Sequence, residues 1–326
     1  MFIHQTVRRN RSEFKIVMAE DQGVNGTIWN KEANYILSWF GWETIGDIDM
    51  DVLGDDEQKY GVDTFLKFES PVKHLPPCVI LEAKSYQTSN VSKSIVQDWI
   101  DRLDKKLSKL KYSEKAQEKY PALTECATLD LGIIAIWFHD LDNYKSFRPK
   151  FVEILKSIKT SNRPKQSEGY HRILLLDNAQ ILKLCSLQNA IAKHNQEARS
   201  LLQFYYPSFL MNDKPIVRSK VLTPEYIFSK VILAESKGQD GKGENVVFYF
   251  GDLQSSSFAY PLKNLLSKCG FMDKEKKIIL YLYNTDNEFR KIKPDIEKVF
   301  NEVEFTIKFM DNLSDLPGEV KTIGHE

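Results

Sequence analysis

The chain has 326 residues, enough for roughly two or three domains that each bury a sizeable core. Lysine plus arginine and aspartate plus glutamate both total 45, so the formal net charge is zero. This balance argues against a large non-specific contact with nucleic acid, because proteins that make such contacts are commonly basic. No apolar run approaches the ~18 residues of a membrane span, and the N-terminus lacks the apolar region of a signal peptide. We therefore expect no membrane association.

The four cysteines lie far apart without C-x-x-C spacing: Cys78, Cys126, Cys185 and Cys269. This pattern predicts neither a zinc site nor a disulfide framework. It fits a reducing compartment, and we expect a cytoplasmic protein.

Residues 28–40 predict the first helix, because their apolar side chains recur at helical spacing and Gly41 suits its C-terminal cap. Glu32 lies on or beside the apolar face, so it is either a residue at the edge of the core or a group that orders a functional site. Residues 42–53 alternate like one half-exposed strand, and we interpret its outward aspartates as solvated rather than metal-binding: Asp47, Asp49 and Asp51.

A further strand is predicted over residues 78–84, and its alternation places Glu82 and Lys84 on the same face. Such a pair at the end of a buried strand is costly to desolvate, so it is usually either solvated at a sheet edge or used in chemistry. Asp63 brings a second carboxylate to the same place if residues 62–69 form the neighbouring antiparallel strand. Two carboxylates and an ammonium form a site suited to Mg²⁺ and a phosphate group.

Residues 91–111 predict a strongly amphipathic helix. Its other side is basic, and two interpretations stay open: an ordinary solvated face, or a surface that flanks a DNA groove. In the second case the candidate DNA-binding side chains are Lys93, Arg102, Lys106 and Lys109. The elements predicted next are a near-continuous apolar strand at 131–138, a helix at 147–160, a buried strand at 172–176 and a helix at 186–204.

We divide the chain into two domains, residues 1–210 and residues 211–326. The second alternates between strand and helix patterns, which predicts a smaller parallel α/β domain with an accessory or partner-binding role. Its first helix, 224–236, runs into Glu235-Ser236-Lys237, a second glutamate and lysine two residues apart. We interpret this second pair as structural, because it ends a capped helix and no G-x-D precedes it.

The ordered set Gly61-Val62-Asp63 and Val79-Ile80-Leu81-Glu82-Ala83-Lys84 resembles the PD-(D/E)XK nuclease superfamily, and most of all its Mrr-like restriction endonuclease branch. The resemblance covers about residues 20–140 and includes a helix on each side of the motif. Two features depart from the family pattern. The turn at 55–60 is charged rather than glycine-rich, and Asp101 stands where the tyrosine of the related Q-x-x-x-Y signature would be.

This resemblance implies a Mg²⁺-dependent or Mn²⁺-dependent endodeoxyribonuclease, whose first domain is a restriction-endonuclease-like mixed sheet flanked by helices. The metal ligands would be Asp63, Glu82 and the backbone carbonyl of Ala83. Lys84 would position the attacking water and stabilise the transition state, and Glu32 would order the metal ligands.

The resemblance also implies DNA as substrate, a second protein subunit or a homo-oligomer as partner, and a role in bacterial restriction or phage defence. The residues themselves leave open whether DNA or RNA is cut. The main alternative is a non-catalytic protein that keeps a nuclease fold for binding nucleic acid or a partner, which the near-neutral charge allows. The complete set of Asp63, Glu82 and Lys84 counts against it. A third interpretation is a structural α/β protein in which the glutamate–lysine spacing is accidental.

Overall fold

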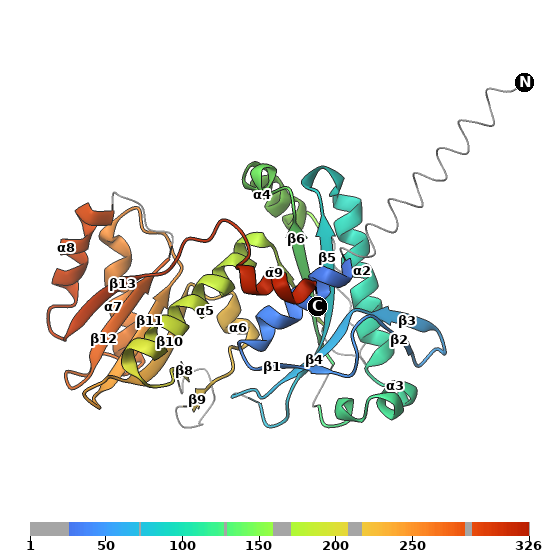
Figure 1. The fold of residues 1–326 in the computed structure, drawn as a ribbon, viewed down its shortest axis with the longest axis horizontal. Helices are drawn as coiled ribbons and strands as arrows, with labels where there is room; N and C mark the ends of the chain where they lie inside the picture. The colour runs from blue at the N-terminus through green and yellow to red at the C-terminus, as the bar shows by residue number, and fades with distance from the viewer. Residues whose placement is uncertain are drawn as a thin grey trace, which may run out of the picture.

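Two large β-sheets with helices around them form the described part of the chain (Figure 1). The structure is a computed structural model, and it describes residues 26–71, 73–126, 129–158, 171–207, 217–283 and 289–325. In these ranges no helix is both long and apolar enough to cross a bilayer. The helices are a first helix over residues 26–38, α2 (Lys93–Leu110), α3 (Glu114–Lys119), α4 (Leu141–Lys156), α5 (Asn178–Ala198), α6 (Pro224–Ile227), α7 (Ala259–Lys268), α8 (Phe289–Val299) and α9 (Gly318–Gly324).

The first sheet has the strand order β1-β4-β5-β6-β7. Its strands are β1 (Trp42–Ile45), β4 (Thr64–Phe68), β5 (Cys78–Tyr86), β6 (Leu131–Phe138) and β7 (Arg172–Leu176). Neighbours from β1 to β5 are antiparallel, whereas β5, β6 and β7 are parallel. This confirms the predicted mixed sheet. The strand β7, expected to be buried, is instead a half-buried strand at the sheet edge.

Helices cover both faces of this sheet, because side chains along its strands alternate between two apolar clusters. One cluster joins Ile80 and Ile134 to α2 and α4. The other joins Val79 and Ile133 to the first helix and α5. The face to which a β5 side chain points therefore decides which helices it meets.

The second sheet has the strand order β13-β12-β11-β10-β8-β9. Its strands are β8 (Gln203–Tyr206), β9 (Val217–Ser219), β10 (Val231–Lys237), β11 (Gly243–Tyr249), β12 (Lys277–Leu282) and β13 (Phe305–Phe309). The last three strands are parallel and linked through α7 and α8, as the alternating pattern predicts. The other neighbours are antiparallel, so the sheet is mixed rather than wholly parallel.

The helix α5 lies between the two sheets and packs on both (Figure 1). Its Leu184 belongs to one apolar cluster with Val79 of the first sheet and Phe248 of the second. Two more contacts cross the predicted division between the domains. The strand β8 precedes that division but pairs with β10, and Val320 of α9 shares the cluster with Trp29 of the first helix. The two sheets therefore share a core.

The single strand predicted over residues 42–53 is wrong. The chain turns at Gly46 and Asp49, where φ is 70° and 55°, values that interrupt an extended strand. As a result β1 joins the first sheet, while β2 (Met50–Leu53) pairs with β3 (Lys59–Val62) in a separate ribbon. The three aspartates do not share one face of a strand.

The helix predicted over residues 224–236 is also wrong. Helix α6 ends at Ile227, and the strand β10 then pairs with β8 on one side and β11 on the other. The β-branched Val231 and Ile232 favour a strand, and burial between two neighbours outweighs the local helical pattern. Glu235 and the lysine two residues later therefore lie on a strand.

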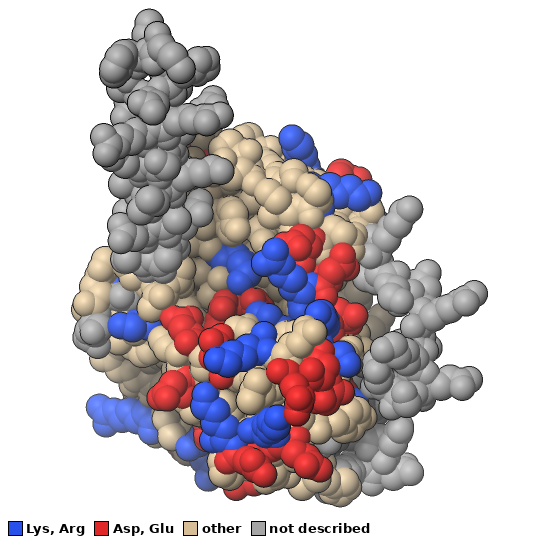
Figure 2. All heavy atoms as spheres, turned by 90° about the vertical axis from the view of Figure 1, so that its right-hand side faces the viewer, with Lys and Arg blue, Asp and Glu red and all other residues tan. Residues whose placement is uncertain are grey.

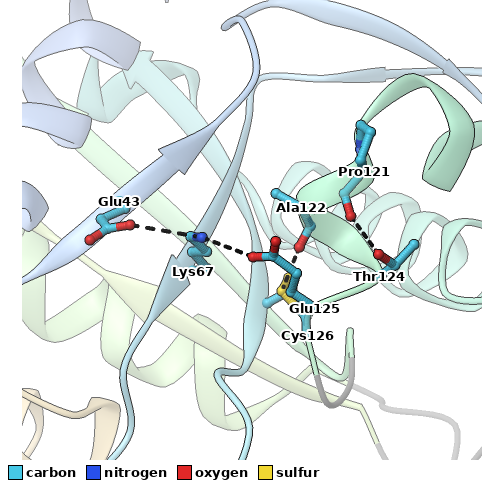
Figure 3. Close-up of a disulfide and its surroundings, with 8 residues drawn as sticks. Glu43, Lys67, Pro121, Ala122, Thr124, Glu125 and Cys126 are labelled. Atoms are coloured by element: carbon cyan, nitrogen blue, oxygen red, sulfur yellow. Dashed lines mark hydrogen bonds and ion pairs between the residues drawn. A yellow bond between two sulfur atoms is a disulfide. The ribbon is translucent and has the colours of Figure 1, made fainter.

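Cys78 and Cys126 form a disulfide, contrary to the expectation from cysteine spacing. Their Cα atoms are 5.7 Å apart although 48 residues separate them in the sequence, a proximity that only the tertiary fold creates. The bond ties the first residue of β5 to the segment before β6. Beside it, Lys67 of β4 lies between Glu43 and Glu125, at 4.0 Å and 3.4 Å from their carboxylate oxygens (Figure 3).

We predict that Val320→Asp destabilises both sheets together, because it places a charge in the shared core. The free energy of unfolding should fall by about 3 kcal/mol, measured in urea as one cooperative transition. Thr322→Asp, at an exposed position of the same helix, is the matched control and should cost less than about 1 kcal/mol. Two separate transitions, of which only one shifts, would contradict the shared core.

Candidate functional site

Asp63, Glu82 and Lys84 meet where β4 begins beside β5. The antiparallel register of these strands pairs Thr64 with Leu81 and so brings Asp63 beside Glu82. The Ala83 N–H donates to Asp63 Oδ2 at 2.7 Å. The Lys84 Nζ atom lies 3.3 Å from Asp63 Oδ2 and 3.0 Å from Glu82 Oε2. One ammonium therefore bridges the two carboxylates that the sequence singled out.

Glu82 projects from β5 toward α2, on the same face as Ile80. Its side chain is only 8% exposed, and its Oε1 atom accepts a hydrogen bond from Lys106 Nζ of that helix. The sequence marked Lys106 only as a candidate DNA contact. The sequence does contain a signal for the contact of Lys106 with Glu82. Lys106 lies between Leu103 and Leu107, which are fully buried and place that side of α2 against the sheet.

Two asparagines of the first helix hold the turn that carries Asp63. The Asn30 side-chain amide donates to the Asp63 carbonyl oxygen and to Asp49 Oδ1, both at 2.9 Å. The Asn34 amide donates to Thr64 Oγ1 at 2.8 Å. Sequence reasoning missed this pair, although a spacing of four residues places both side chains on one side of a helix.

The charges of the cluster act on one another. Burial, reinforced by the charge of Glu82, raises the pKa of Asp63 despite the opposing effects of Lys84 and the Ala83 N–H. Burial alone would lower the pKa of Lys84, but the charges of Glu82 and Asp63 outweigh it and the pKa is raised. Lys84 is therefore a fixed cation at neutral pH and not a base.

Glu32 lies elsewhere. Its residue is 7% exposed, and its charged neighbours are Lys321 of α9 and Asp315. Within the described residues, no hydrogen bond or ion pair joins Glu32 to Asp63 or Glu82. The first helix packs on the face of β5 opposite to the one that carries Glu82, which explains the separation. No contact between Glu32 and Asp63 or Glu82 in the described residues therefore supports the prediction that Glu32 orders the metal ligands.

The candidate DNA-binding side chains are mostly engaged with carboxylates. Lys93 is exposed and has no ionic partner in the described ranges. The other three form the pairs Arg102–Asp98 at 2.9 Å, Lys109–Asp55 at 3.3 Å and Lys106–Glu82. Figure 2 shows the side of the molecule where α2 and α3 lie, and its basic side chains are interspersed with acidic ones. The described residues on this face form no continuous basic stripe.

The two carboxylates fit a hard divalent cation. Proteins commonly bind Mg²⁺ through one or two carboxylates, with waters and substrate phosphates as the other ligands. Asp63 and Glu82 supply such a pair. No group of three or more His, Cys, Asp or Glu side chains in the described chain is placed to hold a metal. The remaining ligands would be the Ala83 carbonyl expected from the sequence, water and substrate.

A separate polar cavity of about 570 Å³ lies where the β10–β11 hairpin and the start of β12 meet the end of α5. At its floor the buried His194 bonds to Ser236 Oγ through Nε2 at 2.7 Å and to Tyr281 OH through Nδ1 at 3.2 Å. Ser236 also donates to Glu244 at 3.0 Å. No sequence motif marks this cluster. Five lysines and five acidic residues line the cavity, so its charge indicates no class of ligand.

Comparison with known proteins gives a family match. The family model described as "GAPS4 protein PD-(D/E)XK nuclease domain" matches residues 18–180. This supports the superfamily that the motif resembles, while the Mrr-like branch stays a prediction. No curated protein matches the chain.

Two of the solved structures that match this chain are only weakly similar to it. They are Aa-Ago with externally bound siRNA, at 14% identity and a TM-score of 0.20, and an Argonaute of Aquifex aeolicus, at 12% and 0.18. The matches cover 82% of this chain but only 40% and 41% of those chains. At these TM-scores the likeness carries no argument.

We predict that Glu32 makes the protein less stable as the pH rises. Burial raises the pKa of Glu32 from 4.5 to about 7, so the folded protein holds this proton more tightly than the unfolded chain. Stability from this proton is present below about pH 4.5 and is lost as the pH rises to about 7.

In urea titrations, Glu32→Gln should therefore be more stable than the wild type by about 1–3 kcal/mol at pH 8, with a smaller difference near pH 5. An equal difference at both pH values would contradict a titrating, buried Glu32.

Proposed function

We propose that this chain, which belongs to the family of the GAPS4 protein PD-(D/E)XK nuclease domain, hydrolyses phosphodiester bonds of DNA with the help of Mg²⁺ or Mn²⁺. The observation that carries the proposal is the meeting of Asp63, Glu82 and Lys84 in one partly buried cluster. Asp63 directly precedes β4, Glu82 lies on the neighbouring strand β5, and the Lys84 ammonium contacts both carboxylates. This combination of hard anionic ligands and a fixed cation suits metal-dependent phosphodiester hydrolysis.

Asp63 and Glu82 would hold the metal, together with the backbone carbonyl of Ala83. When bound, a divalent metal lowers the pKa of a coordinated water and neutralises charge on the phosphate. Lys84 keeps its proton at neutral pH, because the charges of its two carboxylate partners outweigh the effect of burial on its pKa. It would orient the attacking water and stabilise the charge that develops on the phosphate. We do not include Glu32 among the metal-site residues, because its charged neighbours are Lys321 of α9 and Asp315, which precedes that helix.

The substrate would be DNA, cut internally, with α2 beside the bound strand. This helix is next to the site, since its Lys106 reaches Glu82. Its outer side chain Lys93 would contact a DNA phosphate directly. Arg102 and Lys109 would do so after they leave their carboxylate partners Asp98 and Asp55 for the higher negative charge density of DNA.

We propose a cytoplasmic location, although the Cys78–Cys126 disulfide is a bond that a reducing compartment disfavours. There the protein would act as the nuclease of a bacterial restriction or phage-defence system. It would act with a second protein subunit, as a homo-oligomer, or both. The zero net charge supports the need for a partner, because the chain alone has little long-range attraction for DNA. The proposed partner-binding module is residues 211–326.

We predict that Glu82→Ala and Lys84→Ala each slow metal-dependent DNA cleavage by about 100-fold or more. The first removes a metal ligand and the second removes the fixed cation. Cleavage should be measured with Mg²⁺ and Mn²⁺, for the protein alone and with its co-encoded neighbours, and a chelator should stop it. Circular dichroism would show whether each variant is folded.

Glu235 and Lys237 form the matched control, because they have the same spacing on β10. Lys237 is exposed, whereas Glu235 pairs with Arg218 and, at 2.9 Å, with Lys276. Lys237→Ala should leave cleavage unchanged, and Glu235→Ala should lower stability without changing the rate per folded molecule. If only the β10 variants abolish cleavage, we have assigned the wrong pair. Binding of nucleic acid without cleavage under every metal and partner condition would favour the non-catalytic alternative.

A further inference from the structure

We propose that Lys106 is a built-in counter-ion of Glu82 that a divalent metal has to displace. The inference rests on the proposed function and concerns how the site exchanges one cation for another. Each Glu82 oxygen already has an ammonium partner, Lys84 Nζ at 3.0 Å from Oε2 and Lys106 Nζ on Oε1. A metal that binds Glu82 therefore competes with a lysine.

Charge makes this competition unavoidable. Two carboxylates and two ammonium groups form the cluster, so it is neutral as it stands. It is also partly buried, with Glu82 8% and Lys106 13% exposed. A divalent ion added to the intact cluster would leave two uncompensated positive charges where water screens them poorly. Departure of one ammonium and arrival of a singly charged phosphodiester restore neutrality.

Lys106 is the ammonium that leaves. Lys84 contacts both carboxylates and lies two residues from Glu82 on the same strand, so it stays with the ligands. Among the described residues, Lys106 forms an ion pair with Glu82 alone, and it comes from another element. Its helix is held in place, because the flanking Leu103 and Leu107 are fully buried. The exchange is thus a rotation of one long side chain and not a movement of α2.

Two consequences follow for the site. Lys106 keeps the buried Glu82 paired when no metal is bound, which protects the fold from an uncompensated charge. After displacement its ammonium remains beside the site and is available to a DNA phosphate. Metal and DNA therefore favour each other, because each binds better when Lys106 has left Glu82.

Calorimetric titration with Mn²⁺, without DNA, tests the proposal directly. Lys106→Met should bind Mn²⁺ about tenfold more tightly than the wild type, because no ammonium competes for Glu82. Lys106→Arg, which keeps the charge, should stay within about threefold of the wild type. The control is Lys105→Met, which removes the same charge one residue away. Lys105 is exposed and lies over the Tyr60 ring, so Mn²⁺ affinity should not change.

The melting temperature is a second readout, and it also shows whether a Lys106 variant has lost its fold. Without metal, Lys106→Met should melt at a lower temperature than the wild type, and saturating Mn²⁺ should raise its melting temperature by more than that of the wild type. If the Met variant does not fold, Lys106→Gln replaces it, because the amide still bonds to Glu82 without a charge.

The outcomes separate this inference from the proposed function. If Glu82→Gln abolishes Mn²⁺ binding but Lys106→Met and Lys106→Gln bind like the wild type, the metal site stands and the counter-ion role is wrong. If Glu82→Gln leaves Mn²⁺ affinity unchanged, the proposed metal site is wrong and the inference is wrong with it. The same conclusion follows if neither the wild type nor the Lys106 variants bind Mn²⁺.

Discussion

Burial of the Glu82 carboxylate is the constraint on which the site depends. A carboxylate that is 8% exposed has lost most of its hydration, and in proteins that loss costs several kcal/mol unless nearby charges offset it. Lys84 offsets it from the same strand and Lys106 from α2. Those contacts require the observed rotation of α2, and Lys84 can reach Asp63 only in the observed register of β4 and β5.

The shared core sets a second constraint. Helix α5 is buried on several sides, because the first sheet packs on it from one direction and the second sheet from the other. A helix in that position has no single apolar stripe, and the usual sequence signal for its surroundings is weak. The division expected near residue 210 follows the alternating strand and helix patterns along the chain, whereas β8 and α9 cross it because their partners are distant in sequence.

The sequence predicted the parts of the site that depend on local order. Alternation along β5 placed Ile80, Glu82 and Lys84 on one face, and the two apolar clusters confirm that face. The amphipathic pattern of α2 and the continuous apolar run of β6 were equally informative.

Features that depend on long-range contacts escaped prediction. The partner of Cys78 is 48 residues away, and β10 is a strand because it lies between two neighbours. Glu32 has the pattern of a site residue, yet the packing of the first helix turns it toward α9. The link from Lys106 to Glu82 likewise requires knowing which face of the sheet α2 covers.

The central claim is that Asp63 and Glu82 form one metal site. An anomalous-difference map from crystals soaked in Mn²⁺ tests it most directly, since it locates the ion without reference to activity. The account predicts a peak about 2.0–2.3 Å from a carboxylate oxygen of each residue, with the Lys106 ammonium withdrawn from Glu82. A peak bound by other residues, or none at saturating Mn²⁺, would contradict the claim.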